Sequence, residues 1–413
     1  MAAVSRNFVL CMMKPFDLDL LFLPGFLIFI VTWCVAFYVT RSVVFSLPAA
    51  FLKAGIFLIY FGFLFDGTFT FLDDWRYVAG GMALLNEGIG LSNLAENWGF
   101  VLMTGGGDHF LYHLYNAYAF RFFGIGYYAP VALNILLTVL VAWTGSILGA
   151  KEFGLIGQWR KIFFMFLLFQ PDILAWSNVM NGKDIFVLSL HVLLLFAVSL
   201  YFQGRINLAC AIAVPIVAIL LFLRFYVPLL FSVVFVIHQL LAVKRLHHVI
   251  WFIGTTSLLL LGAVMTVGNL MASAWANLLQ DIGNPFFGFL RMTLIPIPFN
   301  TELNYGFLDI PALFHWILMP MVIYGLISLV SQKKNTPFIK FFLIYLAVFM
   351  MLYSVYGELQ GPRHRVQLDF AWTVLQFIGI KRGLVWSLTL RRQSQPALAY
   401  KKAIISNKPF DGV

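Results

Sequence analysis

Long apolar runs decide what this chain can fold into. The run from Leu20 to Thr40 contains no charged residue, and the run from Pro48 to Phe65 contains only Lys53. A helix crosses a bilayer with roughly 20 mainly apolar residues, and both runs reach about that length. Hydrocarbon offers no partner to backbone N–H and C=O groups, so such runs form helices and not open strands. The sequence therefore predicts an all-α, polytopic membrane protein.

Composition excludes a water-soluble domain. Of the 413 residues, 62% are hydrophobic and 11% are charged, whereas a soluble domain carries about a quarter charged residues. We expect about eleven spans in a transmembrane domain of residues 1–380, followed by a basic cytoplasmic tail at 381–413. Besides the first two runs, the expected spans are Tyr128–Ala150, Lys161–Asn178, Ile185–Phe202, Ile206–Leu223, Phe225–Val243, Val249–Asn269, Pro311–Val330, Phe338–Tyr356 and Val366–Ile380.

The stretch from Asp66 to Tyr127 is too polar and too rich in glycine for a clear span. It predicts interfacial amphipathic helices in the first large outer loop, one beginning near Asp74 and one covering His109–Phe123. If the second of these were a short span, every later segment would be inverted. A longer connection, Met271–Ile310, contains Pro296 and Pro298 and is expected to lie over the outer face.

The distribution of charge argues against that inversion. With Asp73 outside, the basic residues collect in the inner segments and the acidic residues in the outer ones, as the positive-inside rule requires. The C-terminus is then cytoplasmic, and Lys53 lies near an inner end where its stem can reach the interface. The net charge of +10 is thus a topology signal with some attraction to anionic lipid, and not a sign of nucleic-acid binding. The inner basic residues are Arg41, Lys53, Lys151, Arg160, Lys161, Arg205, Lys244, Arg245, Lys333, Lys334, Lys340 and those of the tail.

Two adjacent carboxylates, Asp73 and Asp74, follow the second span. Acidic groups beside hydrocarbon are costly and usually functional. An aspartate here can serve as the base that deprotonates an acceptor hydroxyl. The alternative is structural, because the sequence LDDW also suits the N-terminus of a helix.

A basic triplet, Arg363-His364-Arg365, stands at the mouth of the last expected span. Two arginines at an outer membrane edge can bind a phosphate bidentately, although interfacial anchoring explains them as well. Arg224 and Arg291 also break the positive-inside trend, less strongly.

Other candidates carry less information. Lys183 and Asp184 in SNVMNGKDIF suit a solvated turn and a helix N-cap. His109 and His113 have a spacing that zinc sites use, yet no third ligand is placed. Cys11, Cys34 and Cys210 show no metal spacing. No nucleotide-binding or hydrolase motif is present. The sequence specifies no cofactor and leaves a divalent metal open.

Four segments together resemble the C-type glycosyltransferase superfamily (GT-C), which includes protein O-mannosyltransferases and aminoarabinose transferases. They are FLDDWRYVAGGMALL, GGGDHFLYHLYNAYAFRFFGIGYYAPVALNILLTVLVAWTGSILGAKEFG, QPDILAWSNVMNGKDIFVLSL and GPRHRVQLDFAWTVLQFIGI, and they extend from about Phe65 to Ile380. Their order and spacing, more than any one of them, carry the resemblance.

The resemblance implies roles for particular residues. The family's catalytic acid falls on Asp73 or Asp74, and a later outer acid falls on Asp184, with Lys183 beside it. The arginine-rich start of a late span falls on Arg363 and Arg365, which are then expected to face the donor phosphate, supported by Lys183.

We therefore expect a glycosyltransferase that takes a sugar from a polyprenyl-phosphate or diphosphate donor and passes it to an acceptor glycan, lipid or protein. It would act at the outer face of a membrane, most simply the bacterial inner membrane, with Asp184, Arg291, His364 and Arg224 in supporting roles. Two alternatives stay open. One is an O-antigen or exopolysaccharide polymerase or ligase, and the other is a flippase or transporter of lipid-linked sugars.

Overall fold

The computed structural model describes residues 14–105, 110–242, 254, 282–331, 336–385 and 387. These residues form fifteen α-helices up to Arg365, a further helix over 369–385, and several short 3-10 and π turns. Their one β feature is an isolated bridge between Ile282 and Tyr356. The prediction of an all-α fold is confirmed for the described part of the chain.

Among the described residues, seven helical segments are long and apolar enough to cross a membrane, and an eighth forms if one bent pair counts as a single span. This makes the chain a helical polytopic membrane protein. The seven are α2 (Leu18–Thr40), α3 with its π-helical end (Val43–Leu64), α7 (Tyr128–Glu152), α10 (Lys183–Phe202), α11 (Ile206–Leu223), α15 with the preceding 3-10 turn (Leu303–Val330) and α16 (Pro337–Val355).

The bent pair replaces the single span expected at Lys161–Asn178. Helix α8 (Gln158–Leu168) and helix α9 (Pro171–Val179) meet at an angle of 40°. Pro171 lacks the N–H that would continue the first helix, and the side chain of Gln170 caps the second by accepting from the N–H of Ile173 at 2.7 Å. A proline and a capping residue therefore start a new helix inside the apolar run.

Two other expected spans differ from the observed structure. Helix α12 (Tyr226–Ala242) has 17 residues and is too short to count as a full span. The last expected span, Val366–Ile380, begins as a 3-10 turn (Val366–Leu368) and continues as a helix over 369–385, and the short helix α17 (Pro362–Arg365) precedes it. The span expected at Val249–Asn269 and the tail from 388 onward lie outside the described residues.

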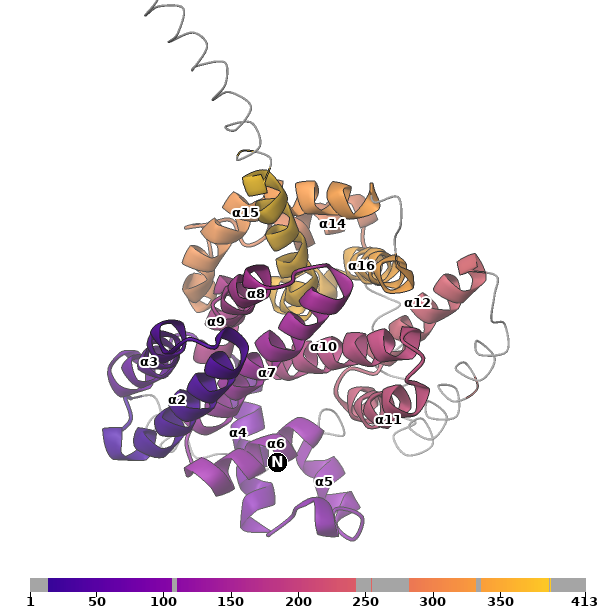
Figure 1. The fold of residues 1–413 in the computed structure, drawn as a ribbon. Coiled ribbons are helices and arrows are strands. Elements are labelled where there is room, and N and C mark those ends of the chain that lie inside the picture. The colour runs from indigo at the N-terminus through magenta and orange to yellow at the C-terminus, as the bar shows by residue number, and fades with distance from the viewer. Residues whose placement is uncertain are drawn as a thin grey trace, which may run out of the picture.

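The central helices are α7 and α10. Two-thirds of each apolar window is buried, against about a third for α2 and α3 and less for α15. Figure 1 shows α7 and α10 passing through the middle of the bundle, with α2 and α3 on one flank and α14 (Pro285–Leu294), α15 and α16 on another. The exposed large apolar residues of α2, α3 and α15 suit contact with lipid chains.

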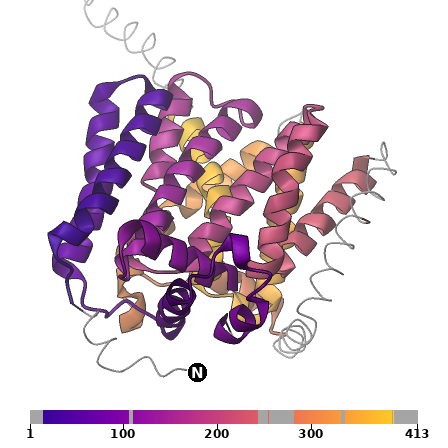
Figure 2. The ribbon, with the colours of Figure 1, turned by 90° about the horizontal axis from the view of Figure 1, so that it is seen from below.

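The short helices of the first large loop pack as a unit. They are α4 (Leu72–Asn86), α5 (Trp98–Gly105) and α6 (Phe110–Phe123), and Figure 2 shows them in purple at one end of the long helices. Helices α4 and α6 approach closely at Gly80 and Gly81. A Cβ added at Gly80 would lie 1.9 Å from Nδ1 of His113, and one at Gly81 would lie 2.6 Å from Cβ of Asn116. Glycine is needed here so that the helix bearing Asp73 can seat against α6.

The opposite end of the bundle carries basic residues. Arg41, Lys151 and Arg205 lie at the connections α2–α3, α7–α8 and α10–α11. Lys381 reaches the same end, because its Nζ donates to the carbonyl of Gly154 at 3.2 Å. The predicted sorting of charge between the two ends is thus visible in these residues.

One expectation about charge is wrong. Lys53 does not reach an interface from an end of its span. It lies near the middle of the span Val43–Leu64 with its side chain fully buried, and no described group accepts a hydrogen bond from its Nζ. Helix α2 packs over α3 and covers this face.

Candidate functional site

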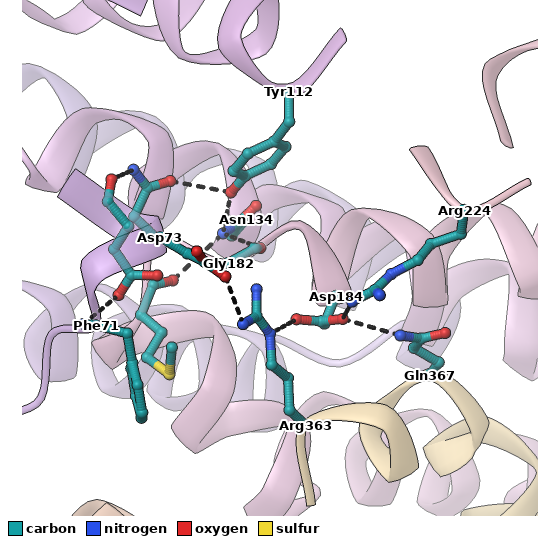
Figure 3. A network of polar contacts seen from close by, with 12 residues as sticks. Phe71, Asp73, Tyr112, Asn134, Gly182, Asp184, Arg224, Arg363 and Gln367 are labelled. Carbon is teal, nitrogen blue, oxygen red and sulfur yellow. Dashed lines mark hydrogen bonds and ion pairs between the residues drawn. The ribbon is translucent and has the colours of Figure 1, made fainter. Parts of the chain in front are cut away.

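The carboxylate of Asp184 is the centre of a polar network at the end of the bundle that holds α4. Asp184 is in the first turn of α10 and is 1% exposed. It accepts three hydrogen bonds: from Nη2 of Arg224 at 2.9 Å, from Nε of Arg363 at 2.8 Å and from Nε2 of Gln367 at 2.9 Å (Figure 3). A buried charge is tolerated only with such partners. Segments far apart in sequence are thereby fixed around one group.

Arg363 connects this buried carboxylate to an open one. Its Nη1 donates to Oδ2 of Asp73 at 3.1 Å, across 290 residues of sequence. The side chain of Asp73 is 52% exposed and that of Arg363 is 19% exposed. Figure 3 shows the guanidinium between the two carboxylates. The network is therefore closed at Asp184 and accessible at Asp73.

The neighbouring Asp74 has a different environment. It is fully buried, and its Oδ2 accepts from the backbone N–H of Phe71 at 3.1 Å and from the hydroxyl of Tyr127 at 2.8 Å. Burial raises its pKa to about 7, which the Arg363 charge and the Tyr127 hydrogen bond partly offset. Asp74 thus caps α4 and ties it to Tyr127, whereas Asp73 faces Arg363.

A set of uncharged residues holds the loop before α10 against α4 and α6. The N–H of Asn181 donates to the Tyr127 hydroxyl at 3.0 Å, and its Nδ2 donates to Oδ1 of Asn116 at 2.8 Å. The hydroxyl of Tyr112 donates to Oδ1 of Asn181 at 3.0 Å. These bonds position Asp184 relative to the helix that carries Asp73.

Further basic and imidazole groups surround the network. Lys183 is buried, with its Nζ 6.0 Å from the centre of the Tyr77 ring. The ring of His364 lies beside Tyr353, at 6.1 Å between ring centres. Burial and the nearby Arg224 lower the pKa of His364 well below its usual range, so the imidazole is neutral.

The predicted site residues thus divide between places. Asp73, Asp184, Arg224 and Arg363 gather in one network, with Lys183 and His364 beside it and Asp74 behind it. Arg365 points elsewhere: it is 2% exposed, pairs with Asp172 at 3.5 Å and donates to the carbonyl of Ile295. Arg291 lies on the exposed side of α14, and no described contact joins it to Asp184.

Sequence reasoning missed several members of the site. Gln367 binds Asp184 and in turn accepts from the hydroxyl of Tyr353 at 2.9 Å. Tyr127 and Asn181 join the loop to α4. The Asn-Gly pair at Asn181 and Gly182 signals a turn, but nothing in the sequence shows which partners that turn has.

The arrangement can bind an anion and accept a proton. Arg224 and Arg363 present guanidinium groups of the kind that bind phosphate oxygens, and Asp73 is a carboxylate open to a hydroxyl group. The arrangement offers few ligands for a metal ion. No three His, Cys, Asp or Glu side chains in the described residues are placed to hold a metal ion. His109 and Asp108 lie outside those residues.

Comparisons of the chain with protein-family models, with curated proteins and with solved structures found no match. The fold alone defines the class, a helical polytopic membrane protein with seven or eight candidate spans in the part of the chain that the structure describes.

Proposed function

We propose that the chain is a membrane glycosyltransferase that uses a lipid-linked sugar donor, with a polyprenyl phosphate or diphosphate as the leaving group. One observation carries the proposal: Arg363 lies between the open carboxylate of Asp73 and the buried carboxylate of Asp184, and Arg224 shares the latter. A base and a phosphate-binding pair of arginines therefore stand side by side.

The chemistry follows from these positions. Asp73 takes the proton of an acceptor hydroxyl, and the hydroxyl oxygen forms a bond to the anomeric carbon of the sugar. The bond from that carbon to the phosphate oxygen breaks, and its electron pair stays on the phosphate. Arg363 and Arg224 stabilise the charge that develops there. Asp184 holds both guanidinium groups in place.

The location of the site supports an outer-face enzyme. The network lies at the end of the bundle opposite Arg41, Lys151 and Arg205, and basic connections favour the cytoplasmic side. We infer that the site opens at the outer, periplasmic surface of a bacterial inner membrane and that the C-terminal tail is cytoplasmic. An acceptor glycan, lipid or protein would approach from that side.

The test is transfer of labelled sugar from polyprenyl-phosphate and polyprenyl-diphosphate donors by purified protein in lipid vesicles. Asp73→Asn should lower the rate of transfer roughly 10²–10⁴-fold, the range for loss of a general base, with donor binding retained. Arg363→Ala should weaken donor binding. Asp66→Asn, which changes another exposed carboxylate at the same end, is the matched control. Full transfer by Asp73→Asn would contradict the proposal.

A polymerase or ligase is the second candidate, and the pairing of two arginines on Asp184 favours it. In that class the arginines, and not Asp73, would be indispensable. Retained transfer in Asp73→Asn together with loss in Arg224→Ala and Arg363→Ala would select it.

The third candidate is a flippase or transporter of lipid-linked sugars, and the buried Lys53 in the middle of α3 favours it, because charged residues inside spans are typical of transport proteins. Movement of the labelled lipid between leaflets without any transfer would select that candidate.

A further inference from the structure

A second cluster of ionisable groups lies within the bundle, separate from the Asp184 network. It joins Asp172 of α9, His315 of α15, Arg365 of α17 and Asp369 at the start of the helix over 369–385. Each of the four is at most 3% exposed. Arg365 is two residues from Arg363, yet it faces Asp172 and not Asp184.

Three of the four groups have clear partners. Nη2 of Arg365 is 3.5 Å from Oδ1 of Asp172, and the amide of Gln170 donates to Oδ2 of Asp172 at 3.4 Å. Nε2 of His315 is 2.8 Å from the carbonyl oxygen of Thr293. A carbonyl only accepts, so this nitrogen carries the hydrogen. Nδ1 of the same ring is 3.8 Å from Asp172, which is beyond hydrogen-bond distance.

Asp369 is the exception. Both of its carboxyl oxygens are buried, and no group in the described residues donates a hydrogen bond to either one. The charged residues that act on it are Asp172 and Arg365. An ionised carboxylate buried without a donor is far more costly than a neutral carboxylic acid.

Charge balance leads to the same residue. A guanidinium stays protonated in proteins, so Arg365 neutralises one carboxylate. The two carboxyl groups of Asp172 and Asp369 therefore leave one negative charge over, and one additional proton makes the cluster neutral. Asp172 has the arginine and the Gln170 amide to stabilise its charge, and His315 has no acceptor within hydrogen-bond distance of Nδ1. The proton belongs on Asp369.

We propose that Asp369 is a proton-binding site, in which the carboxyl group of Asp369 is held as a neutral acid beside the Asp172–Arg365 pair. This inference does not depend on the proposed transferase activity.

The surroundings of Asp369 extend this polar environment into the bundle. Asp369, Trp372 and Gln376 are spaced at i, i+3 and i+7, so they share one face of their helix. The Trp372 indole N–H and both amide atoms of Gln376 are buried and have no partner in the described residues. The ring of His315 packs edge-on against Trp372 at 5.8 Å. Asp369 therefore begins a buried polar stripe and is not an isolated carboxyl group in hydrocarbon.

The cluster also fixes the segment that follows α14. Arg365 donates to the carbonyl of Ile295, and His315 contacts the carbonyl of Thr293. Loss of the Asp369 proton would place a net negative charge among these contacts. Proton binding at Asp369 is thus linked to the contacts that hold residues 293–295.

No three His, Cys, Asp or Glu side chains in the described ranges are placed to hold a metal ion, which favours a proton over a metal cation as the occupant of this site. The experiment must still separate the two. Infrared difference spectroscopy on the full chain in lipid, recorded in potassium and in sodium buffers, detects the C=O stretch of a protonated carboxylic acid. Asp74→Asn serves as the background, because Asp74 is a second buried acid with a raised pKa.

We expect an acid band at neutral pH in the Asp74→Asn protein that disappears in Asp74→Asn with Asp369→Asn. The band should persist when the second substitution is Glu87→Gln, which changes an exposed carboxylate. If the double aspartate variant does not fold, a pH titration of the band in the Asp74→Asn protein replaces it, and loss of the band at high pH supports the proposal. No acid band in Asp74→Asn, or a band that sodium removes at constant pH, would overturn it.

Discussion

Arg363 and Arg365 are separated by a single residue, and the structure places them in two unlike environments. Arg363 is 19% exposed and bridges one open and one buried carboxylate. Arg224 and Gln367 also donate hydrogen bonds to the buried one, Asp184. Arg365 is 2% exposed and is the one arginine of its cluster in the described residues, facing Asp172 with Asp369 close by. The first region has spare donors and an open side. The second is closed, and each member depends on the others.

The comparison teaches that a basic motif can serve two purposes at once. In a site that must admit a ligand, a charge is held by several partners so that one of them can be released. In a closed cluster no partner can be released without leaving a buried charge. The predictions below test this distinction, beginning with the largest expected effect.

Removing Arg365 should be the most damaging change. Arg365→Ala leaves Asp172 as a buried carboxylate without its cation, and breaking a buried pair in this way costs about 3–5 kcal/mol. Arg363→Ala should cost clearly less, because Asp184 keeps Arg224 and Gln367. Thermal unfolding in detergent measures both. Equal losses of stability in the two variants would show that the partners of Asp184 compensate no better than those of Asp172.

The two adjacent aspartates should differ in their effect on pH dependence. The pKa of Asp74 is raised from its ordinary 3.8 to about 7, chiefly by burial. In the window between these values the folded state binds more protons than the unfolded state, so stability falls as pH rises from about 4 through 7 and levels off above that. Between about pH 4 and pH 8 the contribution is on the order of 2–4 kcal/mol.

The measurement is the unfolding temperature across that range for the native chain, Asp74→Asn and Asp73→Asn. Asp74→Asn should reduce the pH dependence to the part that Asp369, the second buried acid, contributes, whereas Asp73→Asn should leave the slope in place. A slope that is unchanged in Asp74→Asn would assign the effect to groups other than Asp74.

Substitution of Gln367 measures how much the hydrogen bond from this neutral donor to Asp184 contributes to stability. Gln367→Leu removes the hydrogen bond to Asp184 and leaves the hydroxyl of Tyr353 without its acceptor. Hydrogen bonds to charged groups contribute about 1.5–3 kcal/mol, and we expect a loss in that range. Gln367→Glu keeps the shape of the side chain, and it should lower stability further because it places two carboxylates together. An increase in stability for Gln367→Glu would contradict the assignment of Asp184 as ionised.

The open ion pair should matter least for stability. Asp73 is half exposed, and pairs of that kind contribute roughly 0–1 kcal/mol. Asp73→Asn should therefore barely change the unfolding temperature, and the small change should diminish with added salt. A large and salt-independent loss would mean that Asp73 has a structural role.

Much of the fold could be predicted because apolar run length decides whether a segment spans a membrane. Seven of the expected spans are observed as long apolar helices, and the short helices that contain Asp74 and His113 were expected as such. Run length does not show where a helix breaks. Gln170 and Pro171 divide one run into two helices. A hydropathy average taken over the run does not show that break.

The site was less accessible to sequence reasoning, because a side chain's partner depends on tertiary packing. Arg363 and Arg365 have the same chemistry and position in the sequence pattern, and only the turn of α17 sends them to different carboxylates. Lys53 looked like an interfacial lysine because the expected span began at Pro48 and placed it near one end, whereas the observed span begins at Val43. The covering helix α2 buries it. Tyr127 and Asn181 gave no signal as members of the site.

The contact between Arg363 and Asp73 has one more consequence. In the structure as it stands, a carboxylate of the protein already occupies one face of the guanidinium that an incoming phosphate would need. If the proposed function holds, Asp73 is an internal competitor for the donor, and donor binding includes the exchange of one anion for another at Arg363. Once released, the same carboxylate is free to meet the acceptor. Arrival of the donor would thus prepare the base, and an acceptor that came first would find it engaged.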